Sequence, residues 1–147
     1  MKKAIYFDMD GTIADFYGVP NWLECIERYD PTPYALAKPL VNMSRLARLL
    51  NHLQAEGWHI GIVSWLSRTG TVEFNAKVTA TKEMWLRTHL KSVHWDEIVI
   101  VPYGVPKHEM VQFAEGVLFD DECRNRENWI GTAYDVDNII EVLKGFM

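Results

Sequence analysis

Two aspartates one residue apart, Asp8 and Asp10, follow a short apolar run near the start of the chain. Side chains alternate along an extended backbone, so both carboxylates project to the same side. Two carboxylates this close repel each other unless a cation lies between them or one keeps its proton. Mg²⁺ prefers oxygen ligands and retains some of its waters, so we predict that it binds here.

The segments that position these acids are predicted strands and helices in alternation. Such a pattern gives an open parallel sheet with helices on both faces, whose ligands bind beyond the carboxyl ends of the strands. Ser64 and the pair Asp120-Asp121 also follow apolar runs, so we expect them at the same edge as Asp8 and Asp10. Strands are predicted at 3–7, 59–63, 97–101, 117–119 and 132–134. A first helix is predicted at 39–56, with Pro39 in its first turn, and a second helix runs from a cap at Thr79 or Thr81 to Leu90, after a loop at 67–77. A short helix begins at Pro106, and a last helix runs from a cap at Asp137 to the residue before Gly145.

Residues 13–38 interrupt this alternation. Gly18 and Pro20 favour a flap or tight hairpin, and one short helix at 22–29 is ended by the prolines that follow it. We therefore predict one domain over residues 1–147, with a small cap or flap insertion at about 13–38 over the mouth of the site.

Composition excludes several classes of protein. Apolar residues make up 48% of the 147 residues, which suffices for one domain with a sizeable core. The net charge of −5 argues against binding to a nucleic-acid backbone, which needs clustered Lys and Arg. No apolar stretch of about 18 residues is present for a membrane span. The two cysteines lack metal spacing and suit a reducing cytoplasm, so we expect a cytoplasmic protein that acts on a small molecule, with its oligomeric state left open.

The run Asp-Met-Asp-Gly-Thr at 8–12, directly after an apolar strand, resembles the first motif of the haloacid dehalogenase superfamily. Ser64, Lys107 and the pair Asp120-Asp121 resemble its second, third and fourth motifs, in the expected order. Most members of that superfamily are magnesium-dependent phosphatases. The resemblance implies a Rossmann-like three-layer α/β fold with a parallel sheet of strand order 3-2-1-4-5.

The resemblance also implies catalytic roles. Asp8 would be the nucleophile that takes the phosphoryl group, and Asp10 the general acid and base. Ser64 would hold a phosphoryl oxygen. Lys107 would offset negative charge on Asp8 and the phosphate, with Lys82 as the alternative lysine.

Two adjacent acids are costly to hold beside Asp8 without a cation, which supports the predicted magnesium site. Its ligands would be Asp8, the main-chain carbonyl of Asp10, Asp120 and waters. Asp121 would act through water or orient the lysine, and Thr12 would support the site from behind the ligands.

A longer run at 8–16 and the helix segment 82–86 resemble the 5'(3')-deoxyribonucleotidases, which implies a nucleotide substrate. Two departures stand out: Thr12 replaces that family's Val, and the insertion of about 26 residues is short for a cap that holds a base. Four aromatic residues near the mouth could stack on a base or belong to the core, namely Phe16, Tyr17, Trp22 and Trp65.

Three other protein classes share some of these features. A receiver domain also uses magnesium and an aspartyl phosphate, but its acidic pair lies on the first strand and its lysine on the fifth. The resemblance implies that Asp10 marks the phosphatase branch rather than a dehalogenase, and the acidic balance disfavours a phosphatase of nucleic-acid ends. We predict a magnesium-dependent phosphomonoesterase that acts through an aspartyl phosphate on a nucleotide or other small phosphorylated metabolite. The alternative is a catalytically degenerate protein of the same fold that binds a phosphorylated ligand or a protein partner.

Overall fold

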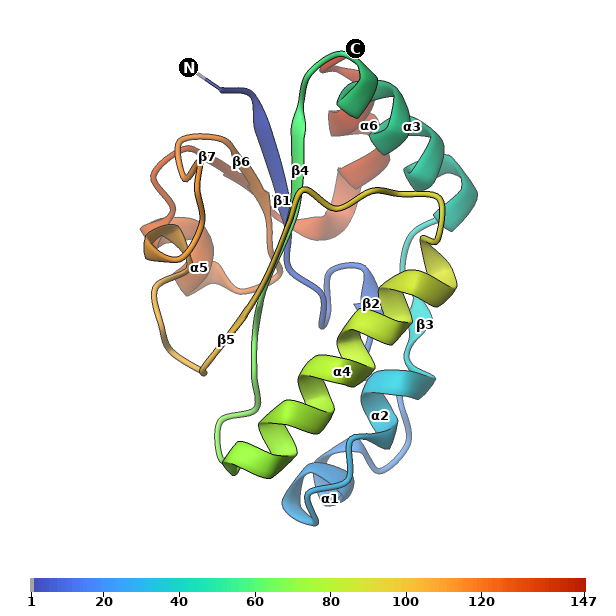
Figure 1. Cartoon of the computed structure of the whole chain (residues 1–147), viewed down its shortest axis with the longest axis vertical. Helices are drawn as coiled ribbons and strands as arrows, with labels where there is room; N and C mark the ends of the chain where they lie inside the picture. Colours follow the sequence, from blue (N-terminus) through green and yellow to red (C-terminus); the bar gives the residue numbers. More distant parts are fainter. Residues whose placement is uncertain (1) are drawn as a thin grey trace.

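The central element is a five-stranded parallel sheet, seen in a computed structural model that describes residues 2–147 (Figure 1). In spatial order the strands are β5-β4-β1-β6-β7, which is 3-2-1-4-5 when they are counted along the chain. The predicted Rossmann-like three-layer fold and its strand order are therefore confirmed. The strands are β1 (Ala4–Phe7), β4 (His59–Trp65), β5 (Glu97–Val101), β6 (Val117–Phe119) and β7 (Thr132–Tyr134).

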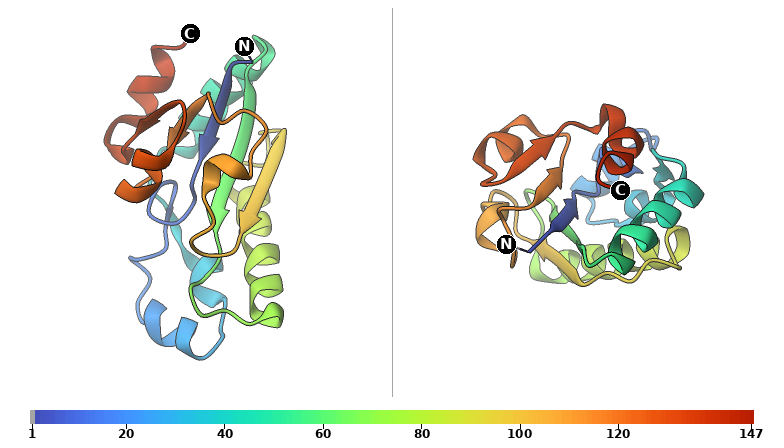
Figure 2. Two further views of the ribbon diagram at one scale, coloured as in Figure 1. Left: turned by 90° about the vertical axis from the view of Figure 1, so that its left-hand side faces the viewer. Right: turned by 90° about the horizontal axis from the view of Figure 1, so that it is seen from above.

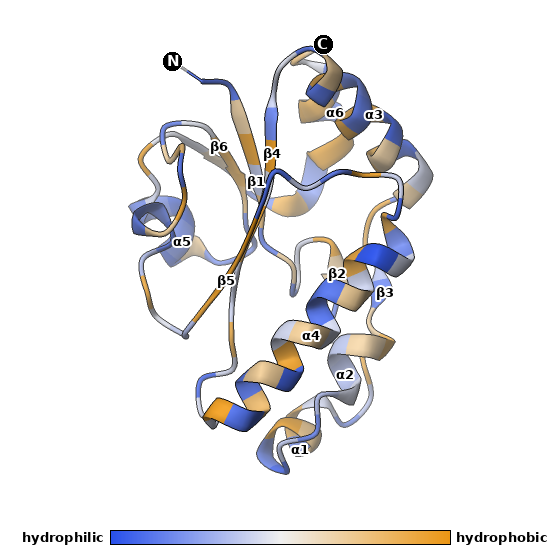
Figure 3. Ribbon diagram, viewed as in Figure 1, coloured by the Kyte–Doolittle hydropathy of each residue, from blue (hydrophilic) through white to orange (hydrophobic). Residues whose placement is uncertain are grey.

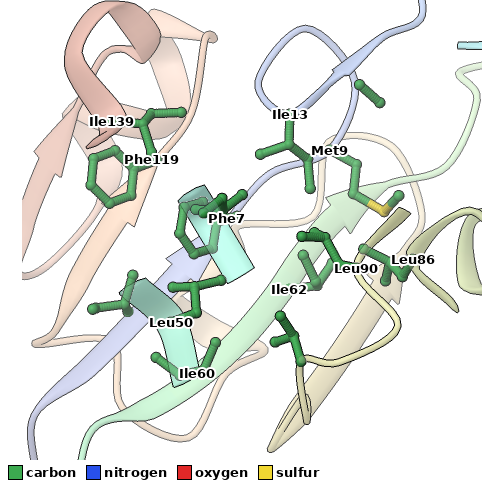
Figure 4. Packing of buried hydrophobic residues seen from close by; sticks show 14 of the residues in the cluster. Phe7, Met9, Ile13, Leu50, Ile60, Ile62, Leu86, Leu90, Phe119 and Ile139 are labelled. Carbon is green, nitrogen blue, oxygen red and sulfur yellow. The ribbon is translucent and has the colours of Figure 1, made fainter. Parts of the chain in front are cut away.

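Strand β1 lies at the centre and buries both of its faces. Ile5 and Phe7 face one side, where they pack under α3 (Met43–Ala55), α4 (Val72–His89) and α6 (Ile139–Lys144). Tyr6 faces the other side with Trp129, which follows α5 (Cys123–Asn128). Figure 4 shows the first of these cores, with Phe7 among side chains from the neighbouring strands and helices. Each large apolar side chain buried this way contributes about 1.5–3 kcal/mol to folding, so β1 is held in place on both faces.

The insertion at 13–38 contains two short helices and is closed at its base by two short strands. Strands β2 (Ala14–Asp15) and β3 (Lys38–Pro39) pair antiparallel, and between them lie α1 (Trp22–Glu27) and α2 (Thr32–Leu36). Helices α1 and α2 lie at the end of the molecule opposite to α6 and the start of β1 (Figures 1 and 2). Helix α1 ends before the prolines, as predicted, although at Glu27 rather than near residue 29. The second helix was not predicted: Pro33 stands in the first turn of α2, where its missing N–H costs nothing.

Three helix starts differ from prediction. Helix α4 begins at Val72, where we expected a loop, because the Thr71 hydroxyl caps it by accepting from the Phe74 N–H at 3.1 Å. Helix α3 begins at Met43 behind the Asn42 side chain, and Pro39 belongs to β3 instead.

The last helix also starts differently. Asp137 lies inside a short 3-10 turn, η2 (Val136–Asn138), which Asp135 caps, and α6 follows without a side-chain cap. A second 3-10 turn, η1 (Lys107–Glu109), begins after Pro106 as expected.

Helices α3 and α4 carry polar and apolar residues together, as expected for helices with one face on a core (Figure 3). Helix α5 is mostly polar in Figure 3, and of its six residues only Asn125 is buried. Within residues 2–147 no helix combines the length and the apolar character needed to cross a bilayer.

Candidate active site

The predicted site residues meet at the carboxyl edge of the sheet. Asp8 follows β1, and its N–H donates to the Phe119 carbonyl at 2.9 Å, which extends the pairing of β1 with β6. Asp120 follows β6 and is fully buried. Ser64 is also buried, and it lies within β4, one residue before the strand ends, rather than after it. Parallel pairing of these strands thus brings residues 8, 64 and 120 to one edge.

Lys107 lies between Asp8 and Asp120. Its Nζ donates to Asp8 Oδ1 at 2.9 Å and to Asp120 Oδ2 at 2.6 Å, and the side chain is almost completely buried. Burial lowers the pKa of Lys107, but the charges of Asp8 and Asp120 outweigh it, so the pKa is raised. Lys107 is therefore a fixed positive charge beside the predicted nucleophile.

Lys82 reaches the same site from α4. Its Nζ lies 3.0 Å from Asp10 Oδ2 and donates to Ser64 Oγ at 2.7 Å and to the Trp65 carbonyl at 2.8 Å. The two candidate lysines thus both reach the site, with different partners. Because the Ser64 oxygen accepts from Lys82, its own hydroxyl proton is left to donate elsewhere.

Asp10 lies two residues after Asp8, directly before the turn at 11–13. Burial raises the pKa of Asp10 and the Lys82 ammonium lowers it, with a net rise. A raised carboxyl pKa is what a group needs in order to give and take a proton near neutral pH.

Thr12 joins the loops that follow β1 and β6. Its hydroxyl lies 3.1 Å from Asp8 Oδ2 and 3.3 Å from Asp121 Oδ1, and it accepts from the Asp121 N–H at 3.2 Å. Gly11 makes this approach feasible: its φ is +79°, and a Cβ there would overlap the Asp121 carboxylate. Thr12 therefore contacts both acids, and its supporting role stays a prediction.

Asn125 is a site residue that sequence reasoning missed. Its Nδ2 donates to Asp120 Oδ2 at 3.2 Å, and the Glu122 N–H donates to Asp120 Oδ1 at 2.9 Å. A signal was present in the sequence: Asn125 follows the acidic pair closely enough to lie in the first turn of a helix beginning there. Together with Lys107, these donors hold the Asp120 carboxylate in one orientation.

Three carboxylates come close enough to share one cation. Oxygen atoms of Asp8, Asp120 and Asp121 lie within 4.8 Å of one another. Desolvation and the charge of Asp8 raise the pKa of both Asp120 and Asp121, although the Asp121 side chain reaches solvent. Carboxylates whose charges oppose each other in this way form a hard-oxygen donor set that suits Mg²⁺. The Asp10 carboxylate faces Lys82 instead, and a role for its main-chain carbonyl stays a prediction.

A cavity of about 430 Å³ opens in front of these acids. All four aromatic residues expected near the mouth line it, although Phe16 is only 3% exposed and packs against Tyr34 inside the insertion. Sequence reasoning missed Arg68 and Tyr103, which follow the ends of β4 and β5 and could have been found as residues just beyond strand ends. The lining includes Asp8, Asp10, Phe16, Tyr17, Trp22, Tyr34, Trp65, Arg68, Tyr103, Lys107, Asp120 and Asp121.

No family model matches the chain, and the search of curated proteins gives no match either. Two solved structures are similar over 99% of this chain. One is the D,D-heptose 1,7-bisphosphate phosphatase of B. bronchiseptica complexed with magnesium and phosphate, with 13% identity, 99% of its own chain covered and a TM-score of 0.58. The other is the same phosphatase of Burkholderia thailandensis, with 12% identity, 98% of its own chain covered and a TM-score of 0.57. This chain has their fold. At these identities the likeness concerns the fold, and the chemistry of this chain rests on its own residues.

Proposed function

We propose that this chain is a magnesium-dependent phosphomonoesterase that acts through an aspartyl phosphate. The observation that carries the proposal is the buried contact of Lys107 with both Asp8 and Asp120, at the carboxyl edge of the sheet and at the floor of an open cavity. A nucleophilic carboxylate needs such a fixed cation, because two anions must approach each other in phosphoryl transfer.

The chain's own residues have distinct tasks in this proposal. An Asp8 oxygen attacks phosphorus, and the ester oxygen leaves with the proton that Asp10 supplies. Water then attacks the phosphorus of the aspartyl phosphate and gives a proton to Asp10. The bond between Asp8 and phosphorus breaks, inorganic phosphate leaves, and the Asp8 carboxylate and the protonated Asp10 are regenerated. Ser64 donates its hydroxyl proton to a phosphoryl oxygen, since Lys82 already donates to the Ser64 oxygen.

Mg²⁺ fits the donor set of Asp8, Asp120 and Asp121, whose oxygens lie within reach of one ion. When bound, it neutralises charge on the phosphoryl oxygens and on the acids. Lys107, Asn125 and Thr12 hold these carboxylates in place for it.

A small phosphorylated metabolite, a nucleotide among them, is the proposed substrate. The cavity of about 430 Å³ falls within the usual range for small-molecule sites. The two proteins that share the fold are phosphatases of a sugar bisphosphate, which supports phosphatase chemistry here. Residues of the insertion line one side of the cavity. We therefore also propose that residues 1–147 form a single domain and that the insertion at 13–38 narrows the mouth of its cavity.

Phosphate release from p-nitrophenyl phosphate, with Mg²⁺ and with EDTA, tests the proposal. We expect metal-dependent release that Asp8→Asn lowers by more than about 1000-fold, because the amide is no nucleophile. A circular dichroism spectrum and thermal unfolding of the variant serve as the control for folding. Release that persists in Asp8→Asn would remove Asp8 as nucleophile, and no release by the parent protein would leave a binding protein of the same fold.

A further inference from the structure

Trp65 and Tyr103 form a rigid aromatic wall of the cavity. Their ring centroids lie 4.9 Å apart, and Trp65 Nε1 donates to the Val105 carbonyl at 2.8 Å. They come from the ends of neighbouring parallel strands, because Trp65 pairs with Val101 in the sheet. The wall therefore lies at the same edge of the sheet as Asp8.

Two arginines lie over this wall: Arg68 also lines the cavity, whereas Arg124 is not among the lining residues and reaches the rings from α5. The Arg124 guanidinium carbon is 4.9 Å from the Trp65 ring centroid and 5.8 Å from that of Tyr103, and Arg68 is 5.8 Å from Tyr103. Within residues 2–147, neither guanidinium has a carboxylate oxygen within 4 Å. A guanidinium over an aromatic ring keeps the N–H groups at its edge free, in a geometry that matches an oxyanion. Two such groups at one wall are available to a ligand.

The arginines also change what the aromatic wall can bind. A base that stacked on Trp65 or Tyr103 would compete with Arg124 for the ring faces. Phe16 and Tyr34 offer little alternative, because they are 3% and 6% exposed and pack against each other. The accessible aromatic rings of the lining apart from this wall are Tyr17 and Trp22, on the insertion. The wall presents positive charge to the cavity rather than bare rings.

Charge is divided across the cavity. Its floor carries Asp8, Asp10, Asp120 and Asp121, balanced in part by two lysines, in a chain with a net charge of −5. A second anionic group on a substrate would be repelled by the free acids there and attracted to the arginines.

We infer that the substrate carries a second anionic group besides the reacting phosphoryl group, and that Arg68 and Arg124 bind it. This inference rests on the proposed phosphatase function. The second group is an oxyanion, a phosphate or a carboxylate, on the part of the molecule that leaves with the ester oxygen. Arg68 and Arg124 are specificity residues and take no part in bond breaking.

Alkyl phosphates of one chain length test this inference, with a phosphate, a carboxylate or a hydroxyl at the far end. We expect kcat/KM for an anionic far end to exceed that for hydroxyl by about tenfold or more, chiefly through KM. Added KCl should shrink this advantage, because exposed charges are screened. The two anionic substrates together identify which oxyanion is preferred.

Variants assign the advantage to the two arginines. In the double variant Arg68→Gln/Arg124→Gln, the ratio of kcat/KM between the bisphosphate or carboxylate substrate and the hydroxyl substrate should fall toward one. Arg87→Gln is the matched control, since Arg87 is an exposed arginine in the last turn of α4 and is outside the cavity lining; its ratio should stay at the parent value.

Two results would overturn the inference: equal kcat/KM for anionic and neutral far ends, or a double variant that keeps the parent ratio. A preference for nucleoside monophosphates over every bisphosphate of the series would also overturn it, in favour of base stacking. Hydrolysis of p-nitrophenyl phosphate reports on the proposed function separately, so failure of one proposal is distinguished from failure of the other.

Discussion

Lys82 has the most demanding environment of the site's residues. A side chain that is 1% exposed must satisfy its three N–H donors within the protein, and Lys82 does so with Asp10, Ser64 and the Trp65 carbonyl. The single ammonium therefore fixes the proposed acid and base together with the proposed phosphoryl-binding hydroxyl. Replacing Lys82 would leave the Asp10 carboxylate and the Ser64 hydroxyl oxygen without this hydrogen-bond donor.

Lys82→Met should cost about 3 kcal/mol of unfolding free energy, because it takes the cation away from the Asp10 carboxylate, whose side chain is only 18% exposed. If Lys82 also positions Asp10 for proton transfer, kcat should fall more for alkyl phosphates, which are poor leaving groups, than for p-nitrophenyl phosphate. Urea unfolding and the two rates measure these effects. Lys77→Met, an exposed lysine of the same helix, is the control, and an equal loss for both substrates would limit Lys82 to a structural role.

At the level of residues, spacing and order were enough to anticipate much of the site. Asp8 and Asp10 were found from their period of two, and the acidic pair from its place after an apolar run. The choice between Lys107 and Lys82 could not be made from sequence, because a long side chain reaches its partner through the rotation of its helix. Arg68 and Tyr103 are irregular loop residues, and only the fold shows that their loops adjoin.

Helix α4 shows how an element's start depends on tertiary contacts. The segment 67–77 is polar and contains a glycine, which favours a loop, yet α4 begins at Val72. Phe74 and Val78 in its first turns are buried against Phe16 and Tyr34 of the insertion. Local propensity is a weak prior, and apolar burial against a distant segment outweighs it here.

Thr71→Ala should therefore destabilise the protein by about 1 kcal/mol, the usual effect of losing an N-cap hydroxyl. Thr79→Ala is the matched control, because Thr79 lies inside α4 and alanine is the better helix former there. Chemical denaturation of both variants measures the difference. An α4 that began near residue 79 would give the reverse order of stability.

The strands were predicted better than the helix ends. All five strands of the sheet begin and end within two residues of their predicted limits. A short apolar run bounded by turn residues is typical of a buried strand. The start of α3 was wrong because Pro39, which suits a first helical turn, belongs to β3 instead. The start of α6 was wrong because Asp135, Asp137 and Asn138 all precede it and any of them could serve as a cap.

For the molecule as a whole, the acids of the site are a source of instability. Desolvation and, after it, the charge of Asp8 make ionisation of Asp121 unfavourable in the fold and raise the Asp121 pKa to about 8. Between its ordinary value, about 4, and the raised value, rising pH therefore costs stability. Residues that lower the stability of the fold in this way are typical of functional sites, here one that binds a cation.

Asp121→Asn should consequently be more stable than the parent in EDTA, with a larger gain at about pH 8 than at about pH 5. Added Mg²⁺ should raise the melting temperature of the parent and raise that of the variant less, because binding to the folded state is lost in part. Thermal unfolding measures both effects. Asp137→Asn, an exposed acid in η2, is the control, and a parent that gains nothing from Mg²⁺ would contradict the metal site.

The insertion shares a core with the first half of α4 that is separate from the two cores of the sheet. This third cluster comprises Phe16, Tyr34, Leu66, Phe74 and Val78. The β2–β3 pair closes the base of the insertion with two residue pairs and forms a small sheet separate from the five-stranded one. Backbone amides of α1, α2 and the start of α4 should thus exchange their hydrogens with deuterium as one cooperative unit, and faster than those of β1. If the mouth of the cavity opens, the start of α4 would then move together with the insertion, rather than the insertion moving alone.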